Sequence, residues 1–96
     1  MKATADCESI IGMITQRFNP KRIYQWGSLL QKEMFADYSD IDIALEGMGS
    51  IQDVMELERV AESMTDFPLD IVEIEKIDPA HADSIRSKGR LAYERS

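Results

Sequence analysis

The sequence predicts a small α/β (α+β) fold, in which helices cover a mixed β-sheet. Segments with apolar residues at helical spacing alternate along the chain with short segments rich in β-forming residues. Of the 96 residues, 44% are hydrophobic and 30% are charged, which is typical of a soluble globular protein. No repeat, low-complexity stretch or linker rich in Pro, Gly and Ser divides the chain. We therefore expect residues 1–96 to form a single domain.

The first half of the chain predicts two helices and two strands. In order, these are a helix over residues 6–18, a strand over 21–26, a short helix over 28–35 and a strand over 40–46. The first helix ends at Asn19-Pro20, because a residue before proline avoids the helical conformation. Gly27 stops the first strand, and Ser28 can cap the helix that follows it. The second strand alternates strictly, with Ile41, Ile43 and Leu45 on one face and Asp40, Asp42 and Ala44 on the other.

The second half predicts two further helices and two strands. These are a helix over residues 50–64, a strand over 69–74, a helix over 78–88 and an edge strand over 91–93. Ser50 is the expected N-cap of the first helix. Asp78 followed by Pro79 is typical of a helix start, and Gly89 of a helix end. The result is a small sandwich with one mixed sheet and helices over at least one of its faces.

Charge and cysteine content exclude several classes of protein. A net charge of −7 argues against a dedicated nucleic-acid binder, which needs a basic face. Cys7 is the only cysteine, so no internal disulfide can form, and we expect this side chain to be a small buried hydrophobe. There is neither a signal-peptide core nor an apolar run near the ~20 residues that span a membrane. We therefore expect a cytoplasmic protein that does not insert into membranes.

A domain of this size has a narrow margin of stability. It buries only about 60–65% of its unfolded surface. An additional interface, in a homo-oligomer or in a complex with a second protein, would therefore be useful to it.

The Asp40-Ile41-Asp42 segment calls for an explanation beyond folding. Aspartate is depleted in strands, and two aspartates on one strand face lie roughly 6.5–7 Å apart. Mg²⁺ binds through one or two carboxylates and keeps places for phosphate oxygens, so a cation could hold this pair. The alternative is an exposed strand face with two solvated aspartates.

Two further features are ambiguous when each is taken alone. Gly27-Ser28 lies between a strand and a helix, where backbone N–H groups and the serine hydroxyl could bind a phosphate; the alternative is an ordinary turn with an N-cap. Asp70 lies in an apolar strand and could complete a carboxylate cluster with Asp40 and Asp42. Alternatively, Asp70 belongs to an edge strand and faces solvent.

Together these features resemble the nucleotidyltransferase superfamily, related to DNA polymerase beta. The shared plan is Gly27-Ser28, a spacer, the acidic pair that follows Ser39, and a later single acidic residue at Asp70. The small size and the segment from Ile85 to Glu94 resemble the minimal nucleotidyltransferase (MNT) branch. The resemblance covers residues 21–94 and implies a nucleotidyltransferase-like sandwich.

The resemblance also implies roles for individual residues. It assigns nucleotide binding to Gly27, Ser28 and Ser39, and catalysis and metal binding to Asp40, Asp42 and Asp70. Two Mg²⁺ ions would bridge the triphosphate of a nucleoside triphosphate, ATP being the first expectation, and Asp70 would help to deprotonate the acceptor hydroxyl. One departure concerns residues 29–33, Leu-Leu-Gln-Lys-Glu, where many members have an Arg-Ala-Arg-Gly-like run. This departure puts nucleotide affinity or nucleotide choice in question.

Free-standing MNT proteins resemble the antitoxin half of HEPN–MNT pairs, in which AMP is added to a tyrosine of the HEPN toxin. We therefore expect a helical HEPN-type protein to be the partner and acceptor, in an AMPylation reaction. The alternative function is a non-catalytic MNT-fold module that acts by docking to a helical partner.

Two other residues have alternative interpretations. We expect Trp26 to pack in the core, with stacking on a base as the alternative, and His81 to be structural or on the surface.

Overall fold

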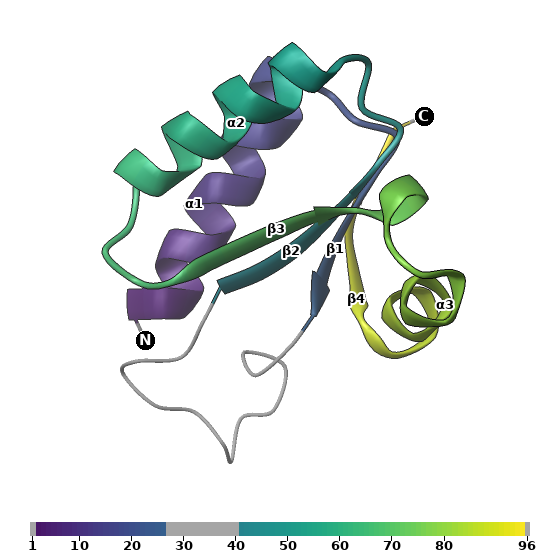
Figure 1. The fold of residues 1–96 in the computed structure, drawn as a ribbon. Coiled ribbons are helices and arrows are strands. Elements are labelled where there is room, and N and C mark those ends of the chain that lie inside the picture. The colour runs from purple at the N-terminus through teal and green to yellow at the C-terminus, as the bar shows by residue number, and fades with distance from the viewer. Residues whose placement is uncertain (1, 27–40, 96) are drawn as a thin grey trace.

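The computed structural model describes residues 2–26 and 41–95 (Figure 1). In chain order its elements are α1 (Lys2–Arg17), β1 (Arg22–Trp26), β2 (Ile41–Glu46), α2 (Ile51–Ser63), β3 (Leu69–Glu73), the 3₁₀ turn η3 (Ile74–Lys76), α3 (Pro79–Lys88) and β4 (Arg90–Glu94). The helix expected over residues 28–35 lies outside the described residues.

The four strands of the described chain form one mixed sheet in the order β3-β2-β1-β4. β2 and β3 are parallel, whereas β1 is antiparallel to both β2 and β4. The β1–β4 pairing shifts register between Ile23 and Tyr24. The mixed sheet is confirmed, and so is the final edge strand, because β4 lies at the edge next to β1.

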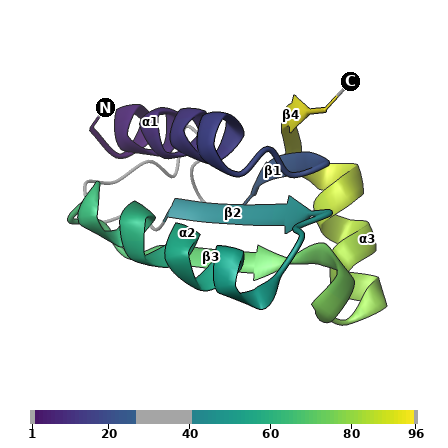
Figure 2. The same cartoon turned by 90° about the horizontal axis from the view of Figure 1, so that it is seen from above.

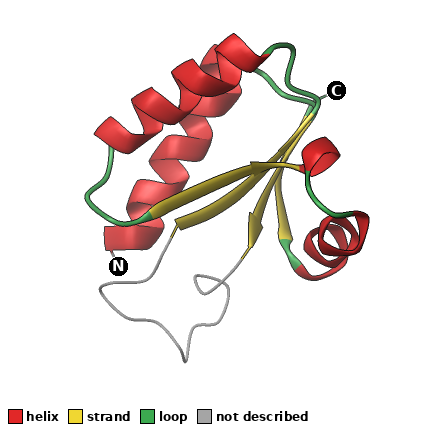
Figure 3. Cartoon of the chain, in the orientation of Figure 1, coloured by secondary structure: helices red, strands yellow, loops and turns green. Residues whose placement is uncertain are grey.

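Helices cover both faces of this sheet. α1 and α2 lie over one face and α3 lies against the other (Figures 1 and 3). Seen from above, α1 and α2 run beside each other along the sheet (Figure 2), and the Thr65 hydroxyl after α2 donates to Asp6 of α1 over 2.8 Å. The core between these two helices and the sheet contains Cys7, Ile10, Ile11, Ile14, Ile23, Ile41, Ile43, Leu45, Leu57 and Ala61. A second cluster, on the α3 face, contains Tyr24, Ala44, Ile74, Ala82 and Ile85.

The helix ends agree with the signals in the sequence. The Ser50 hydroxyl accepts a hydrogen bond from the backbone N–H of Asp53 at the start of α2. Asp78 does the same for Ala80 at the start of α3, where Pro79 is the first helical residue. Gly89 ends α3 and donates its N–H to the carbonyl of Ile85. These local predictions are confirmed.

Several predicted boundaries differ from the structure by one residue, and the start of the first helix differs by about four. α1 begins at Lys2 rather than near residue 6, because backbone hydrogen bonding extends upstream of the apolar stripe. The strand expected over residues 69–74 ends at Glu73, and Ile74 begins the turn η3 instead. Ile74 leaves the strand because its side chain, only 2% exposed, is buried in the α3 cluster.

The expectation that Cys7 is a small buried hydrophobe is confirmed. Its side chain is fully buried in the α1–α2 core, and burial raises the pKa of its thiol to about 11. Within residues 2–26 and 41–95, there is no helix with the length and apolar character that crossing a membrane requires.

Candidate active site

Asp42 and Asp70 lie side by side on neighbouring strands. They are Cα partners in the parallel pairing of β2 with β3. Adjacent strands are about 4.8 Å apart, and residues paired in this way point to the same face of the sheet. Asp42 is 8% exposed, whereas Asp70 is open to solvent. The register therefore juxtaposes one buried and one accessible carboxylate that are 28 positions apart in the sequence.

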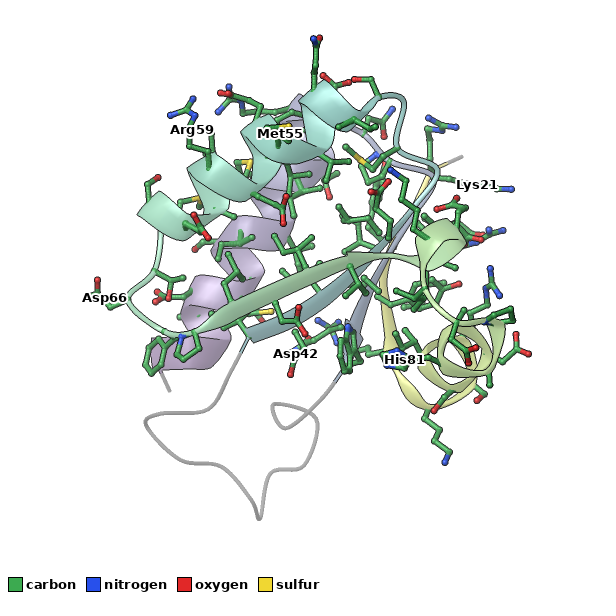
Figure 4. The ribbon with its side chains drawn as sticks, viewed as in Figure 1. Lys21, Asp42, Met55, Arg59, Asp66 and His81 are labelled. Carbon is green, nitrogen blue, oxygen red and sulfur yellow. The ribbon has the colours of Figure 1, made fainter. Side chains whose placement is uncertain are left out.

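The face that carries this pair is the one that α3 covers in part. Ala44 follows Asp42 on the same side of β2, and Val72 follows Asp70 on the same side of β3; both pack in the α3 cluster. The aspartates lie one step beyond this cluster, at the end of the sheet where β2 and β3 begin. Figure 4 shows Asp42 at this end. α1 and α2 do not cover the pair, since they pack on the opposite face.

Trp26, the last residue of β1, extends the row on the other side of Asp42. It is the Cα partner of Asp42 in the antiparallel β1–β2 pairing. Its indole ring meets the imidazole of His81 on α3 edge to face, with ring centroids 5.3 Å apart and planes at 87°. Figure 4 shows His81 on the side of α3 nearest the sheet. The side chains in order across this end of the face are therefore Asp70, Asp42, Trp26 and His81.

A separate ion-pair network closes the opposite end of β2. The carboxylate of Glu46 accepts hydrogen bonds from Arg22 on β1 at 3.1 Å and from Arg86 on α3 at 3.0 Å. Burial is the largest influence and raises the pKa of Glu46, but the bonds from Arg86 and Arg22 outweigh it and lower the pKa below its ordinary value. This network anchors α3 to the sheet and so helps to place His81.

The aspartate pair has the donor chemistry of a divalent-cation site. An ionised carboxylate only accepts, and Mg²⁺ is commonly held by one or two carboxylates together with phosphate oxygens. Among the described residues there is no group of three or more potential metal ligands. Asp42 and Asp70 therefore fit a site with two protein carboxylates, to which a further ligand can be added.

The structure brings together two of the residues that the sequence singled out, Asp42 and Asp70. The others, Gly27, Ser28, Ser39 and Asp40, lie outside the described residues. The alternative interpretation of Asp70 is confirmed, because β3 is an edge strand and its aspartate is exposed. Asp70 also faces the same side as Asp42, and its membership of a carboxylate cluster that includes Asp40 stays a prediction. The sequence did not predict that His81 lies beside Asp42 and Trp26, because the contact between His81 and Trp26 depends on how α3 packs on the sheet.

A family model described as polymerase beta, nucleotidyltransferase, matches residues 8–96 of this chain. A comparison with curated protein sequences gives no significant match.

Two solved structures have a similar fold. A crystal structure of the MntA–HepT toxin–antitoxin matches with a TM-score of 0.69 and 19% identity, over 96% of this chain and 73% of that one. A crystal structure of a toxin–antitoxin with AMP-PNP matches with a TM-score of 0.70 and 23% identity, over 93% of this chain and 74% of that one. At these identities the likeness establishes a shared nucleotidyltransferase-like fold.

Proposed function

This chain belongs to the polymerase beta nucleotidyltransferase family, and from that premise we propose that it transfers AMP from ATP to a hydroxyl of a protein partner, with Mg²⁺. The observation that carries the proposal is the register of Asp42 with Asp70. Family membership makes the domain a nucleotidyltransferase; the nucleotide, the metal and the acceptor are the parts that we propose.

The two carboxylates have different roles in this proposal. Asp42, which is almost buried, holds a fixed position in β2 and ligates the metal. Asp70 is exposed at the edge of the sheet, where an acceptor hydroxyl can reach it, so it also accepts the proton of that hydroxyl. Asp40, Gly27, Ser28 and Ser39 lie outside the described residues. We assign Asp40 to the metal and the other three to the nucleotide.

The reaction is an in-line substitution at the α-phosphorus of the nucleotide. The acceptor oxygen forms a bond to the α-phosphorus, the bond from that phosphorus to the bridging oxygen breaks, and pyrophosphate leaves. The hydroxyl proton passes to Asp70. Mg²⁺, when bound, neutralises charge on the phosphates and on the departing pyrophosphate. The chain's own contribution is to hold the carboxylates in register, since positioned charge supplies most of the catalysis in such reactions.

A helical HEPN-type protein is the proposed acceptor and partner. The support is the fold shared with a chain of the MntA–HepT toxin–antitoxin. ATP is the proposed nucleotide because the second similar structure was determined with AMP-PNP. The protein would then act as an antitoxin that modifies its partner.

The test is transfer of label from ATP radiolabelled at the α-phosphate to a HEPN-type partner in the presence of Mg²⁺. We expect Asp42→Asn to lower transfer by about a hundredfold or more, because it removes a charged ligand while keeping the shape of the side chain. The matched control is Asp66→Asn, which neutralises an exposed aspartate before β3, away from Asp42 (Figure 4).

Each outcome has a definite meaning. Label on the partner with wild type and Asp66→Asn, but not with Asp42→Asn, would support the enzyme and the metal carboxylate together. Equal transfer by Asp42→Asn would contradict the assignment of the site. A stable complex with the partner and no transfer by wild type would favour a docking module instead.

A further inference from the structure

We infer that Trp26 and His81 form the wall against which the base of the nucleotide packs, and that this wall favours purines over pyrimidines. This proposal rests on the proposed function, because the nucleotide whose base packs on this wall is the one that has its phosphates at Asp42 and Asp70. The base subsite consists of one residue from β1 and one from α3.

The position of the aromatic pair gives the direction in which the base lies. Asp70 and Trp26 flank Asp42 on its two sides in the sheet register. Beyond Asp70 the described sheet ends, because β3 is its edge strand. Beyond Trp26 the row continues into the ring of His81, with centroids 5.3 Å apart. A nucleotide with its phosphates at the aspartates therefore has, on the Trp26 side, a pair of aromatic rings in contact against which its base can pack.

The two aromatic residues differ in exposure. Trp26 is partly buried against the α3 cluster, whereas His81 is exposed on the first turns of α3. The edge-to-face contact fixes the two rings relative to each other without requiring a hydrogen bond. Stacking of a base on such side chains is worth about 1–3 kcal/mol by alanine substitution. A purine has the larger ring system and so gains more from this contact.

The indole N–H of Trp26 is a buried donor next to the proposed base subsite. Its Nε1 is buried, and it has no hydrogen-bond partner within the described part of the chain. A buried tryptophan normally finds a partner for this donor, and leaving the donor unpaired costs about 1–3 kcal/mol.

Trp26 is itself the reporter for the first experiment, because it is the only tryptophan of the chain. The full-length protein is titrated with ATP, CTP or inorganic tripolyphosphate, each with Mg²⁺, and tryptophan emission is recorded. We expect ATP to quench the emission more than CTP does. Tripolyphosphate, which has no base, should compete with ATP for binding and change the emission little.

The second experiment measures dissociation constants by calorimetry. We expect His81→Ala to weaken ATP binding at least about fivefold and to leave tripolyphosphate binding unchanged. His81→Phe keeps a flat ring and should restore most of the ATP affinity, which a residue acting through hydrogen bonds would not allow. The matched control is Ser84→Ala, at an exposed position of the same helix, which should bind ATP like wild type.

The outcomes separate this inference from the proposed function. Unchanged ATP binding by His81→Ala, or an equal loss of ATP and tripolyphosphate binding, would overturn the base subsite while leaving the aspartate site untouched. Equal quenching by ATP and tripolyphosphate would overturn it as well. No binding of any nucleotide by wild type would overturn both.

Discussion

At the scale of single residues, exposure distinguishes two aspartates that share one face of the sheet. Asp42 is nearly buried in a central strand, whereas Asp70 is exposed on an edge strand. The difference follows from sheet order, because a central strand has neighbours on both sides and β3 has one. Alternation in the sequence assigned Asp42 to the face opposite the isoleucines. It could not show how exposed either carboxylate is.

Glu46 leads to a residue-scale prediction about stability and pH. Glu46→Gln removes the charge that accepts from Arg22 and Arg86, and should lower the free energy of unfolding by about 1–2 kcal/mol at pH 7. The folded state lowers the pKa of Glu46 from its ordinary value of 4.5. Its stabilising contribution is therefore present above that value and is lost as the pH falls below it.

Urea unfolding of wild type and Glu46→Gln, followed from pH 7 to pH 3, measures this effect. The difference between the two proteins should narrow below about pH 4.5. Asp83→Asn is the control, because Asp83 bonds the same Arg86 at 3.4 Å with its own side chain 80% exposed. Such a surface pair contributes little, so the variant should lie within about 0.5 kcal/mol of wild type. A constant difference between wild type and Glu46→Gln across this range would contradict the prediction.

At the scale of elements, sequence signals that lie within a few residues of each other were sufficient to predict where α2 and α3 begin. Ser50 and Asp78 cap their helices as expected, because a cap contacts a backbone group only two or three residues away. The end of β3 was predicted one residue too late. Ile74 is apolar and fits a strand pattern, but its burial against α3 is a long-range contact that local periodicity does not contain.

A pair of glycines provides a prediction at this scale. Gly47, which follows β2, has a φ of +79°, and a Cβ there would lie 2.5 Å from the Cβ of Lys21. Gly47→Ala should therefore cost about 2 kcal/mol or more in the free energy of unfolding. Gly12→Ala should instead stabilise the protein by about 0.5–1 kcal/mol, because Gly12 lies inside α1 and its added Cβ meets nothing within 4 Å.

The urea concentrations at the midpoint of unfolding, measured for wild type and the two variants, test both stability predictions. The midpoint should fall for Gly47→Ala and rise for Gly12→Ala, although both substitutions add the same methyl group. If both substitutions destabilised the protein equally, the turn geometry assigned to Gly47 would be wrong.

At the scale of the whole molecule, binding of the nucleotide should appear as thermal stabilisation. The chain is small, so a ligand that binds only the folded state has a large effect on its melting temperature. Mg²⁺ with ATP at ten times its dissociation constant should add about 1.4 kcal/mol, or about 6–11 °C in Tm.

Differential scanning fluorimetry with Mg²⁺ alone and with Mg²⁺ plus ATP tests this expectation. Asp70→Asn should lose most of the increase in Tm, because it removes one carboxylate of the pair. Asp66→Asn should keep the increase. An equal increase in all three proteins would mean that ATP binds somewhere other than the aspartate pair.

The sequence by itself determined the order and type of the described α-helices and strands, the caps of α2 and α3, and the face of β2 on which Asp42 lies. These features depend on propensity, periodicity and contacts over a few residues, all of which can be read along the chain. Only the tertiary structure decided that Asp70 stands in register with Asp42, and that His81 meets Trp26. The pairing of β2 with β3 and the packing of α3 join residues far apart in sequence. Such contacts are selected by the burial of the whole core rather than by any local segment.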